Sequence, residues 1–434
     1  MRQIKLARLL LVLLLAAWAG TSHGEPLQIE VTQGQVAALP VAIVPFGGVS
    51  LPVDMAQVID DDLGRSGRIR TLERGAQPQR TADPEALRWS AWQQAEADYI
   101  VLGQVQPAQG KGGDYQLVLQ IFDSYRRRRV AGFRIPVEQG DLRHAAHIGS
   151  NLIYEELLGL PGAFDGRIAY VSAQVPSGQV AASEYQLIVA DADGQNARTI
   201  LRSDQPILSP RWSADGSRLA YVSYRDAEQT VFIQDLRSGQ RRALPNTVGI
   251  NGAPDFSPDG NQLALAVSEG MDTNLYLMDL GSGQMRRLTR TSGIDTEPDF
   301  SPDGQRLVFT SDRSGAQQVY EMELSSGSVR RVTRQGRANL SPRYSPDGQS
   351  LVLVHQDGGY RIALLDLAGG GLDIIGSGPL DESPDFAPNG DIILFAAKQG
   401  GRNQLFTVSS DGAVRQRMVG GGQIQSPAWA PARP

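Results

Sequence analysis

The second half of the chain alternates short apolar runs with polar turn segments, and one turn segment recurs at a nearly constant spacing. Six copies share the order proline, any residue, aromatic residue, then Ser or Ala, and most continue to an Asp-Gly or Asn-Gly pair. Their leading prolines are Pro210, Pro254, Pro298, Pro342, Pro384 and Pro427, so the period is 42 to 44 residues. A fixed period of this size indicates a repeat architecture in which each unit packs against its neighbours.

Each repeat has the pattern of four antiparallel strands. Ser-Pro-Asp-Gly is typical of a type I turn, because proline presets φ at the second position and glycine suits the fourth. Apolar runs of strand length follow, such as 262–267 and 274–279, and a Gly-containing turn then leads to a short polar strand such as 285–289. Four strands per repeat predict one blade of a β-propeller.

The two ends of the repeat region are incomplete in complementary ways. Residues 166–172 match the apolar strand of later repeats but lack the proline-led strand before it, whereas the copy at Pro427 has no apolar strand after it. We therefore predict that a C-terminal strand near 426–430 completes the blade begun at Asp165. The result is an all-β six-bladed propeller, closed by its C-terminal strand so that no blade edge is left exposed.

The aromatic residue of each copy is predicted to be core, because six equivalent large side chains on a period of two pack between blades. The residue before each aromatic should then face the central channel. These predicted channel residues are Arg211, Asp255, Asp299, Arg343 and Asp385, with Ala428 in the sixth copy. The turn and core residues repeat from copy to copy, whereas these positions vary, so we interpret the rim as a binding surface. The alternative is that solvent-exposed loops vary in sequence without any binding function.

Residues 34–160 lack this period and predict a separate N-terminal α/β domain before the propeller at 165–434. Apolar patterns predict strands at 38–46, 99–106, 115–123 and 130–137 and helices at 53–66, 84–96 and 141–158. Asp141 is a candidate N-cap for the last helix. An alternating segment in the arm at 25–33 either adds a strand to a partner's sheet or is an ordinary edge strand.

Residues 1–24 have the composition of a secretory signal peptide. Arg2, Lys5 and Arg8 precede an apolar run from Leu9 to Ala19 that contains no charge. This run is about half of the ~20 residues that span a bilayer, so a membrane helix is the weaker interpretation. Cleavage is predicted after Ala19 or Gly24, and we expect an exported protein.

The composition of the chain limits which partners it can bind and which chemical groups it can use. The chain has 41 Lys and Arg residues against 47 Asp and Glu residues, and its formal net charge is −6. An acidic protein repels phosphate backbones and anionic headgroups, so nucleic acid is a poor candidate partner. The absence of cysteine excludes disulfides, thiol catalysis, thiolate zinc sites and a lipidated N-terminal cysteine.

No motif predicts a catalytic residue, a cofactor or a metal. The only Gly-x-Ser-x-Gly match, 20–24, lies in the predicted signal segment. His144 and His147 share a helical face, but no third ligand is indicated. Residues 191–194 resemble the start of a calcium loop, yet later ligand positions do not fit, so we interpret them as a hairpin turn. The arginine run 126–129 is interpreted as a solvated hairpin tip.

In these features the chain resembles the TolB family, the periplasmic proteins of the Tol–Pal envelope system of Gram-negative bacteria. The segments that carry the resemblance lie in both domains: 39–46, 140–143, 251–260, 274–279, 295–298 and 381–384. The resemblance implies a non-enzymatic periplasmic adaptor that supports outer-membrane integrity and constriction during division. It also implies that the propeller rim binds the lipoprotein Pal, that the arm binds TolA, and that colicin-like toxins exploit the channel mouth.

The resemblance assigns particular residues to these contacts. The Pal-facing rim would comprise Asn251, Gly252, Ala253, Asp295, Thr296, Glu297, Asp381 and Glu382. The TolA-binding arm would comprise Pro26, Leu27, Gln28, Ile29, Glu30 and Val31. Ile250 departs from the family pattern, in which many relatives have a polar or imidazole side chain. Association with the outer membrane would be peripheral and made through Pal only.

Two other classes of function stay open. Propellers with this repeat also cap prolyl peptidases, but such an enzyme needs an α/β-hydrolase domain with a nucleophile elbow, for which the chain has no room. The third class is a propeller that binds a small ligand or a sugar.

Overall fold

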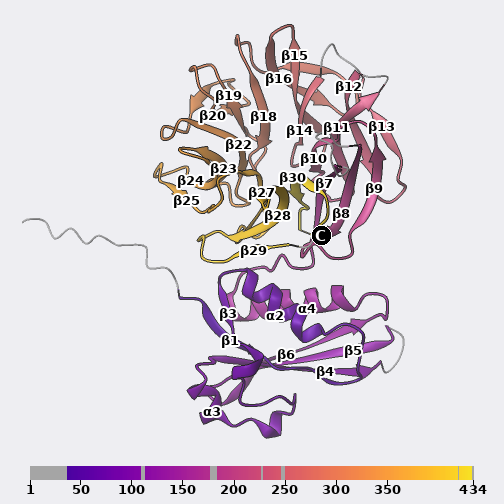
Figure 1. The fold of residues 1–434 in the computed structure, drawn as a ribbon, viewed down its shortest axis with the longest axis vertical. Coiled ribbons are helices and arrows are strands. Elements are labelled where there is room, and N and C mark those ends of the chain that lie inside the picture. The colour runs from indigo at the N-terminus through magenta and orange to yellow at the C-terminus, as the bar shows by residue number, and fades with distance from the viewer. Residues whose placement is uncertain are drawn as a thin grey trace, which may run out of the picture. The chain divides into compact units, whose positions relative to one another are not determined.

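The computed structural model describes residues 37–108, 113–175, 183–225, 228–245, 250–418 and 420–432 (Figure 1). The predicted signal segment and the arm, including the six residues predicted to bind TolA, lie outside the described residues. Residues 38–434 belong to one unit. Within the described residues, we find no helix of the length and apolar character that a membrane span requires.

The N-terminal α/β region is built on a mixed six-stranded sheet of order β3-β1-β4-β5-β6, with β2 paired to β4. Its strands are β1 (Leu39–Ile43), β2 (Gly47–Gly48), β3 (Ile69–Thr71), β4 (Tyr99–Pro107), β5 (Tyr115–Asp123) and β6 (Arg128–Val137). β1 runs parallel to β3 and β4, whereas β4, β5 and β6 form antiparallel hairpins. The sequence did not indicate β2 or β3, because two or three residues are too few to show a period.

Two helices, α2 (Met55–Arg65) and α4 (Leu142–Leu158), pack against each other and against this sheet. The packing is closest at Gly149 on α4, where a Cβ would lie 3.1 Å from a methyl of Leu119 and 3.2 Å from a methyl of Ile59. A larger residue there would push the helix off the sheet, so the glycine sets the distance between them.

The helix ends follow the predicted capping chemistry in part. Asp54 caps α2, because its side chain accepts the N–H of Gln57 at 3.0 Å. Asp141 occupies the N-cap position of α4, but its side chain makes no capping hydrogen bond. Gly159 ends α4 at a φ of 68°, a left-handed conformation that glycine adopts without a steric cost.

The single helix predicted at 84–96 is wrong. A 3-10 turn, η2 (Pro84–Ala86), precedes a short helix, α3 (Trp89–Gln94), and a second 3-10 turn, η1 (Arg74–Ala76), lies before both. Leu87 separates η2 from α3 in an extended conformation, with φ −66° and ψ 113°. Leu87 and Trp92 are buried in the same apolar cluster, so the break allows both side chains to reach one core.

The remaining strands form six antiparallel four-stranded sheets, the blades of a propeller (Figure 1). The first three blades are β10 (Leu208–Trp212), β11 (Arg218–Arg225), β12 (Glu228–Asp235) and β13 (Arg241–Ala243); β14 (Ile250–Phe256), β15 (Gln262–Glu269), β16 (Asp272–Asp279) and β17 (Met285–Arg287); and β18 (Asp295–Phe300), β19 (Arg306–Ser311), β20 (Gln318–Glu323) and β21 (Val329–Arg331). The last three are β22 (Ala338–Tyr344), β23 (Ser350–Gln356), β24 (Tyr360–Asp366) and β25 (Leu372–Ile374); β26 (Asp381–Phe386), β27 (Ile392–Gln399), β28 (Arg402–Ser409) and β29 (Arg415–Arg417); and β30 (Gln423–Trp429), β7 (Arg167–Gln174), β8 (Glu184–Asp191) and β9 (Arg198–Ser203).

The sixth blade closes the ring with the C-terminal strand, which confirms the predicted fold. β30 pairs antiparallel with β7, so that Ile424 lies opposite Ser172 and Trp429 lies opposite Ile168. Beyond the strand, the N–H of Ala430 donates to the carbonyl of Arg167 at 2.8 Å. The two ends of the propeller region are thus joined by a full strand pairing.

The repeated motif forms the predicted turn and core. In the second blade, the N–H of Gly260 donates to the carbonyl of Ser257 at 2.8 Å, and the Ser257 hydroxyl accepts from the N–H of Gln262 at 2.9 Å. The six aromatic residues of the repeat are only 5 to 8% exposed: Trp212, Phe256, Phe300, Tyr344, Phe386 and Trp429. Their burial confirms that they pack the ring.

Every innermost strand carries a bulge at the residue before the repeat's proline. These residues have φ between 47° and 55°: Ser209, Ala253, Glu297, Ser341, Ser383 and Ser426. The pairing register shifts at each of them. Left-handed backbone costs a non-glycine residue roughly 1 to 2 kcal/mol, so six copies mark a built-in feature. The bulge separates the rim half of each strand from its channel half.

Candidate partner-binding rim and channel

The charged residues predicted for the channel lie on the innermost strands of five blades, and the structure brings four of them into pairs. Arg211 on β10 reaches toward Asp385 on β26, with Nη1 4.0 Å from Oδ2, although the first and fifth blades are not neighbours in the ring. Arg343 Nη1 lies 3.5 Å from Oδ1 of Asp299. These side chains therefore form a charged belt around the channel.

The three carboxylates of this belt also join neighbouring blades. Each accepts a hydrogen bond from the backbone N–H of the next blade's aromatic residue: Asp255 from Phe300 at 2.9 Å, Asp299 from Tyr344 at 2.8 Å, and Asp385 from Trp429 at 2.7 Å. A carboxylate bound to a backbone N–H makes a strong, charge-assisted hydrogen bond. The belt thus holds three of the six blade junctions.

Burial raises the pKa of all three carboxyl groups. The pKa of Asp255 rises to about 7, although the Arg211 charge and the Phe300 N–H act in the opposite direction. The pKa of Asp299 is raised well above its usual range by burial and by the neighbouring charge of Asp255. Burial likewise raises the pKa of Asp385, against the charge of Arg211. The net charge of the channel therefore changes near neutral pH.

Two acidic residues predicted for the rim are buried, and each lies beside an arginine of the propeller. Asp295 is fully buried, and Arg313 Nη2 lies 3.0 Å from both of its carboxylate oxygens. Asp381 is 1% exposed, with Arg415 Nη2 3.6 Å away. Burial raises the pKa of Asp381, while the Arg415 charge lowers it. Both acids orient rim loops and do not present a carboxylate to solvent.

The other predicted rim residues are placed differently. Glu297 joins the third blade to the fourth, because its carboxylate accepts from the N–H and hydroxyl of Ser341 at 2.8 and 2.7 Å. Thr296 is half-buried, and Glu382 is exposed, where it accepts from Asn403 Nδ2 at 2.7 Å. Of these three side chains, only that of Glu382 is exposed, whereas Thr296 and Glu297 are half-buried.

The second-blade part of the predicted rim lies on β14. Ala253 is 8% exposed and forms the bulge of this strand at a φ of 48°. Gly252 beside it has a φ of 150°, and no heavy atom lies within 4 Å of the position that a Cβ would occupy. The Asn251 side chain lies outside the described residues.

Sequence reasoning missed exposed apolar side chains beside the rim acids. Ile294 precedes Asp295 and is 42% exposed, and Leu380 precedes Asp381 and is 44% exposed. Met271, at the tip between β15 and β16, is 97% exposed. The detectable signal was an apolar residue one position before the rim acid in two repeats. Exposed apolar side chains beside the rim acids favour a protein contact.

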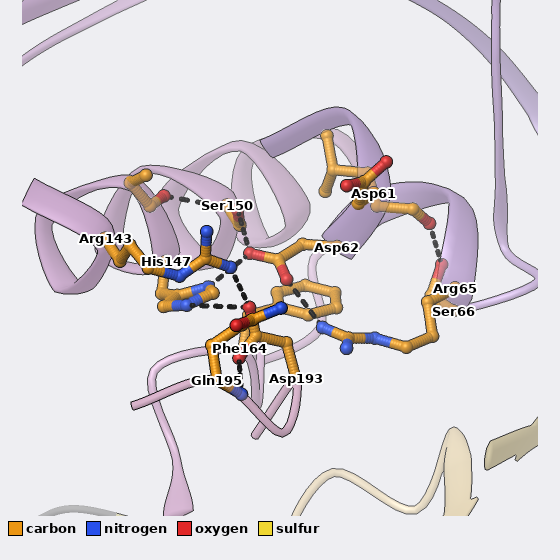
Figure 2. Close-up of polar contacts among 12 residues, drawn as sticks. Asp61, Asp62, Arg65, Ser66, Arg143, His147, Ser150, Phe164, Asp193 and Gln195 are labelled. Carbon is orange, nitrogen blue, oxygen red and sulfur yellow. Dashed lines mark hydrogen bonds and ion pairs between the residues drawn. The ribbon is translucent and has the colours of Figure 1, made fainter. Parts of the chain in front are cut away.

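A second cluster of charged side chains is buried where α2 and α4 meet the turn between β8 and β9 (Figure 2). His147 Nδ1 lies 2.6 Å from Oδ2 of Asp62, and both side chains are 1% exposed. His147 Nε2 faces Asp193 Oδ2 at 3.6 Å. Arg65 Nη2 donates to Oδ1 of Asp62 at 2.5 Å, and Arg143 donates to Asp193. The two pairs that involve Asp193 cross from the α/β region to the sixth blade.

This cluster also has the spacing of a cation site. Three possible ligand atoms lie within 4.8 Å of one another, one each from His147, Asp191 and Asp193. However, the Asp193 oxygen that faces His147 also accepts from Arg143, so a guanidinium already supplies the positive charge there. We therefore assign no metal to the cluster. His144, which shares the helical face, instead lines a groove of about 550 Å³.

An α/β region followed by a six-bladed ring defines the chain as a β-propeller protein with an N-terminal α/β region. Family models agree with this class: the TolB amino-terminal domain matches residues 27–130 and the TolB beta propeller domain matches residues 154–433. The chain belongs to the TolB family of Tol–Pal system proteins.

Individual relatives support this assignment over nearly the whole chain. The Tol-Pal system protein TolB of Thioalkalivibrio sulfidiphilus is 56% identical over 413 residues, which are 93% of this chain and 94% of the relative. TolB of Methylococcus capsulatus is 55% identical over 429 residues, 98% of this chain and 99% of the relative. The crystal structure of TolB from Acinetobacter baumannii has a TM-score of 0.82 at 36% identity, covering 91% of this chain and 97% of its own.

Proposed function

We propose that the protein is a non-enzymatic periplasmic adaptor of the Tol–Pal system, which supports outer-membrane integrity and constriction during cell division. The observation that carries this proposal is the similarity to Tol–Pal system proteins at 55 to 56% identity across both domains. The signal-like composition of residues 1–24 supports a periplasmic location. We propose two binding surfaces: the propeller rim binds Pal, and the N-terminal arm binds TolA.

The rim suits a protein partner because it combines a fixed backbone with exposed side chains. Asp295, Glu297 and Asp381 hold the rim loops from inside, and preorganised loops lose little entropy on binding. Ile294 and Leu380 then provide apolar contact area at the surface. We propose that Pal contacts these side chains together with Thr296, Glu382 and the 251–253 segment.

The arm at 25–33 is proposed to bind TolA through the alternating residues Pro26 to Val31. An extended segment of this kind can pair with the edge of a partner's sheet. The channel mouth, lined by Arg211, Asp255, Asp299, Arg343 and Asp385, is the proposed entry point for colicin-like toxins. Association with the outer membrane would be indirect, through the Pal lipoprotein.

Calorimetric titration of the purified protein with soluble Pal and with the periplasmic part of TolA tests both surfaces. Thr296→Arg should weaken Pal binding at least tenfold, about 1.4 kcal/mol, because a long charged side chain would occupy the rim. Deleting residues 25–33 should abolish TolA binding and leave Pal binding unchanged.

Thr199→Arg, on the exposed outer strand β9, is the matched control and should bind both partners normally. Unchanged Pal affinity in Thr296→Arg would remove the rim from the proposal. A wild-type protein that binds neither partner would overturn the adaptor function as a whole.

A further inference from the structure

His147 lies inside a cluster of charges that comes from three elements of the fold. The groups around it are Asp62 and Arg65 on α2, Arg143 on its own helix α4, and Asp193 at the turn between β8 and β9 (Figure 2). Asp191, the last residue of β8, lies nearby. The imidazole is 1% exposed, so these neighbours, and not water, determine its charge. The sequence positions are far apart, and only the fold brings them together.

The charges in the cluster balance when the imidazole is protonated. Three carboxylates then face two guanidinium groups and one imidazolium, and each ring nitrogen faces a carboxylate: Nδ1 at 2.6 Å from Asp62 and Nε2 at 3.6 Å from Asp193. Loss of the proton leaves a net negative charge in a buried place and removes one of the two N–H donors. A buried uncompensated charge is costly, so the neutral form is the less stable one.

We propose that His147 is a pH-sensitive latch between the α/β domain and the propeller, closed when the protonated imidazole bridges Asp62 and Asp193 and loosened when the proton is lost. Asp62 belongs to the same domain as His147, whereas Asp193 belongs to the sixth blade. The proton therefore controls a contact between domains as well as one within a domain.

The direction of the pH effect follows from the surroundings of the ring. Burial alone would lower the pKa of His147, but the charge and hydrogen bond of Asp62 and the charge of Asp193 raise it above its ordinary 6.5. Since the pKa is higher in the closed state, the stabilisation is complete below pH 6.5 and is lost as pH rises through the closed-state value. Each unit of that elevation corresponds to a tenfold change in the closing equilibrium.

A further polar contact between the domains, at Asp391, does not share this dependence. Asp391, on the turn into β27, accepts from the Tyr154 hydroxyl at 2.8 Å and pairs with Arg68 at 3.0 Å. Burial raises the pKa of Tyr154, and the Asp391 charge raises it further, so the hydroxyl stays protonated across the range in which His147 titrates. An apolar cluster also continues from the α/β sheet into the propeller. Alkaline pH should therefore weaken the contact at Asp193, where Arg143 alone then supplies the positive charge, while the contact at Asp391 remains.

Two spin labels on the full-length protein can measure this loosening, and the chain offers a clean background because it has no cysteine. Glu156→Cys on α4 and Ser326→Cys in the third blade are exposed labelling positions, one in each domain. We expect a narrow distance distribution by pulsed electron resonance at pH 5.5 that broadens as pH rises to 9, with a midpoint above 6.5.

His147→Gln keeps a hydrogen-bonding side chain that does not titrate, and it should abolish the midpoint. His144→Gln, one turn earlier on the same helix, is the matched control and should titrate like the wild type. The proposal would be refuted if the distance distribution of the wild type did not change with pH. It would also be refuted if His147→Gln kept the wild-type midpoint.

Asp193→Asn provides a second route if His147→Gln fails to fold, because Asp193 lies at the edge of the cluster and is 12% exposed. NMR titration of the His147 ring should give a pKa above 6.5 in the wild type and a lower pKa in Asp193→Asn. Equal pKa values in the two proteins would show that the propeller does not hold the ring, which would also refute the proposal. Neither measurement requires Pal or TolA, so the outcome is independent of the adaptor function.

Discussion

The propeller and the α/β domain bury their cores in different ways. In the ring, the same aromatic position is buried in all six blades. It lies in the proline-led strand, just before the repeated turn. The α/β domain uses each core residue once: Trp92 fills one side of the sheet, and Gly149 sets the spacing of one helix. Repetition spreads stability over equivalent junctions, whereas a unique core concentrates it in single contacts.

The repetition is nevertheless incomplete at the channel. Three junctions are joined by Asp255, Asp299 and Asp385, but the junction between the sixth and first blades uses Trp212, whose indole N–H donates to the Ala428 carbonyl at 3.2 Å. The core of the ring is uniform, while the residues of its inner surface differ between blades. A repeat protein can therefore keep one fold and still present a specific surface.

The largest expected effect tests whether the ring tolerates the loss of one pairing. Deleting residues 423–434 removes β30 and with it the buried Trp429 and Ile424. Losing a buried tryptophan alone costs about 3 to 5 kcal/mol, so the shortened chain should lose its cooperative thermal unfolding by circular dichroism. Deleting only residues 432–434 is the control and should melt like the wild type. A normal melting curve for the longer deletion would show that closure is dispensable.

The unique core should respond nearly as strongly to a single substitution. Trp92→Ala empties the centre of an apolar cluster that contains only α/β residues, at an expected cost of about 3 to 5 kcal/mol in denaturant unfolding. The neighbouring Trp89 is half-buried, so Trp89→Ala should cost clearly less. If the two variants were equally destabilised, burial would not explain the role of Trp92.

The channel belt predicts a pH dependence of stability. Because the pKa of Asp255 is about 7 in the folded protein and 3.8 ordinarily, the unfolded chain loses this proton first. Stability should therefore fall as pH rises from about 4 to about 7. Asp255→Asn keeps an acceptor for the Phe300 N–H and should gain more than about 1 kcal/mol over wild type at pH 8, since one pKa unit is about 1.4 kcal/mol.

Denaturant midpoints at pH 4, 6 and 8 would measure this difference. Asp303→Asn is the control, because Asp303 lies in the exposed turn that follows the same strand as Asp299. Parallel pH curves for wild type and Asp255→Asn would contradict the assignment of a raised pKa to this residue.

The smallest effect is expected for an ion pair at the surface of the α/β domain. Arg74 Nη1 lies 2.7 Å from Oδ2 of Asp54, and the side chains are 35% and 54% exposed. Arg74→Ala should change the unfolding free energy by less than about 1 kcal/mol, because solvent screens such pairs. A larger loss would mean that Asp54 needs its partner in order to cap α2, and Asp54→Asn would then distinguish the cap from the pair.

The ring could be predicted from the sequence because a repeat leaves a period, and the incomplete ends at Gly166 and Pro427 indicated closure. The break at Leu87 could not be predicted, since the local pattern suits a helix and the tertiary core interrupts it. The inward orientation of Asp295 depends on Arg313, which approaches only in the folded blade. His147 and residues 191–194 each stood out in the sequence, but no local signal indicated that the fold brings them together with Asp62.

The strand pairing between β30 and β7 also has a consequence for synthesis. Translation produces β7 before β30, so the ring cannot close until the segment that forms β30 has been synthesised. A stalled or trimmed product would display an unpaired strand edge, the kind of surface that proteases and chaperones recognise. The last blade can therefore be completed only in chains translated through Trp429.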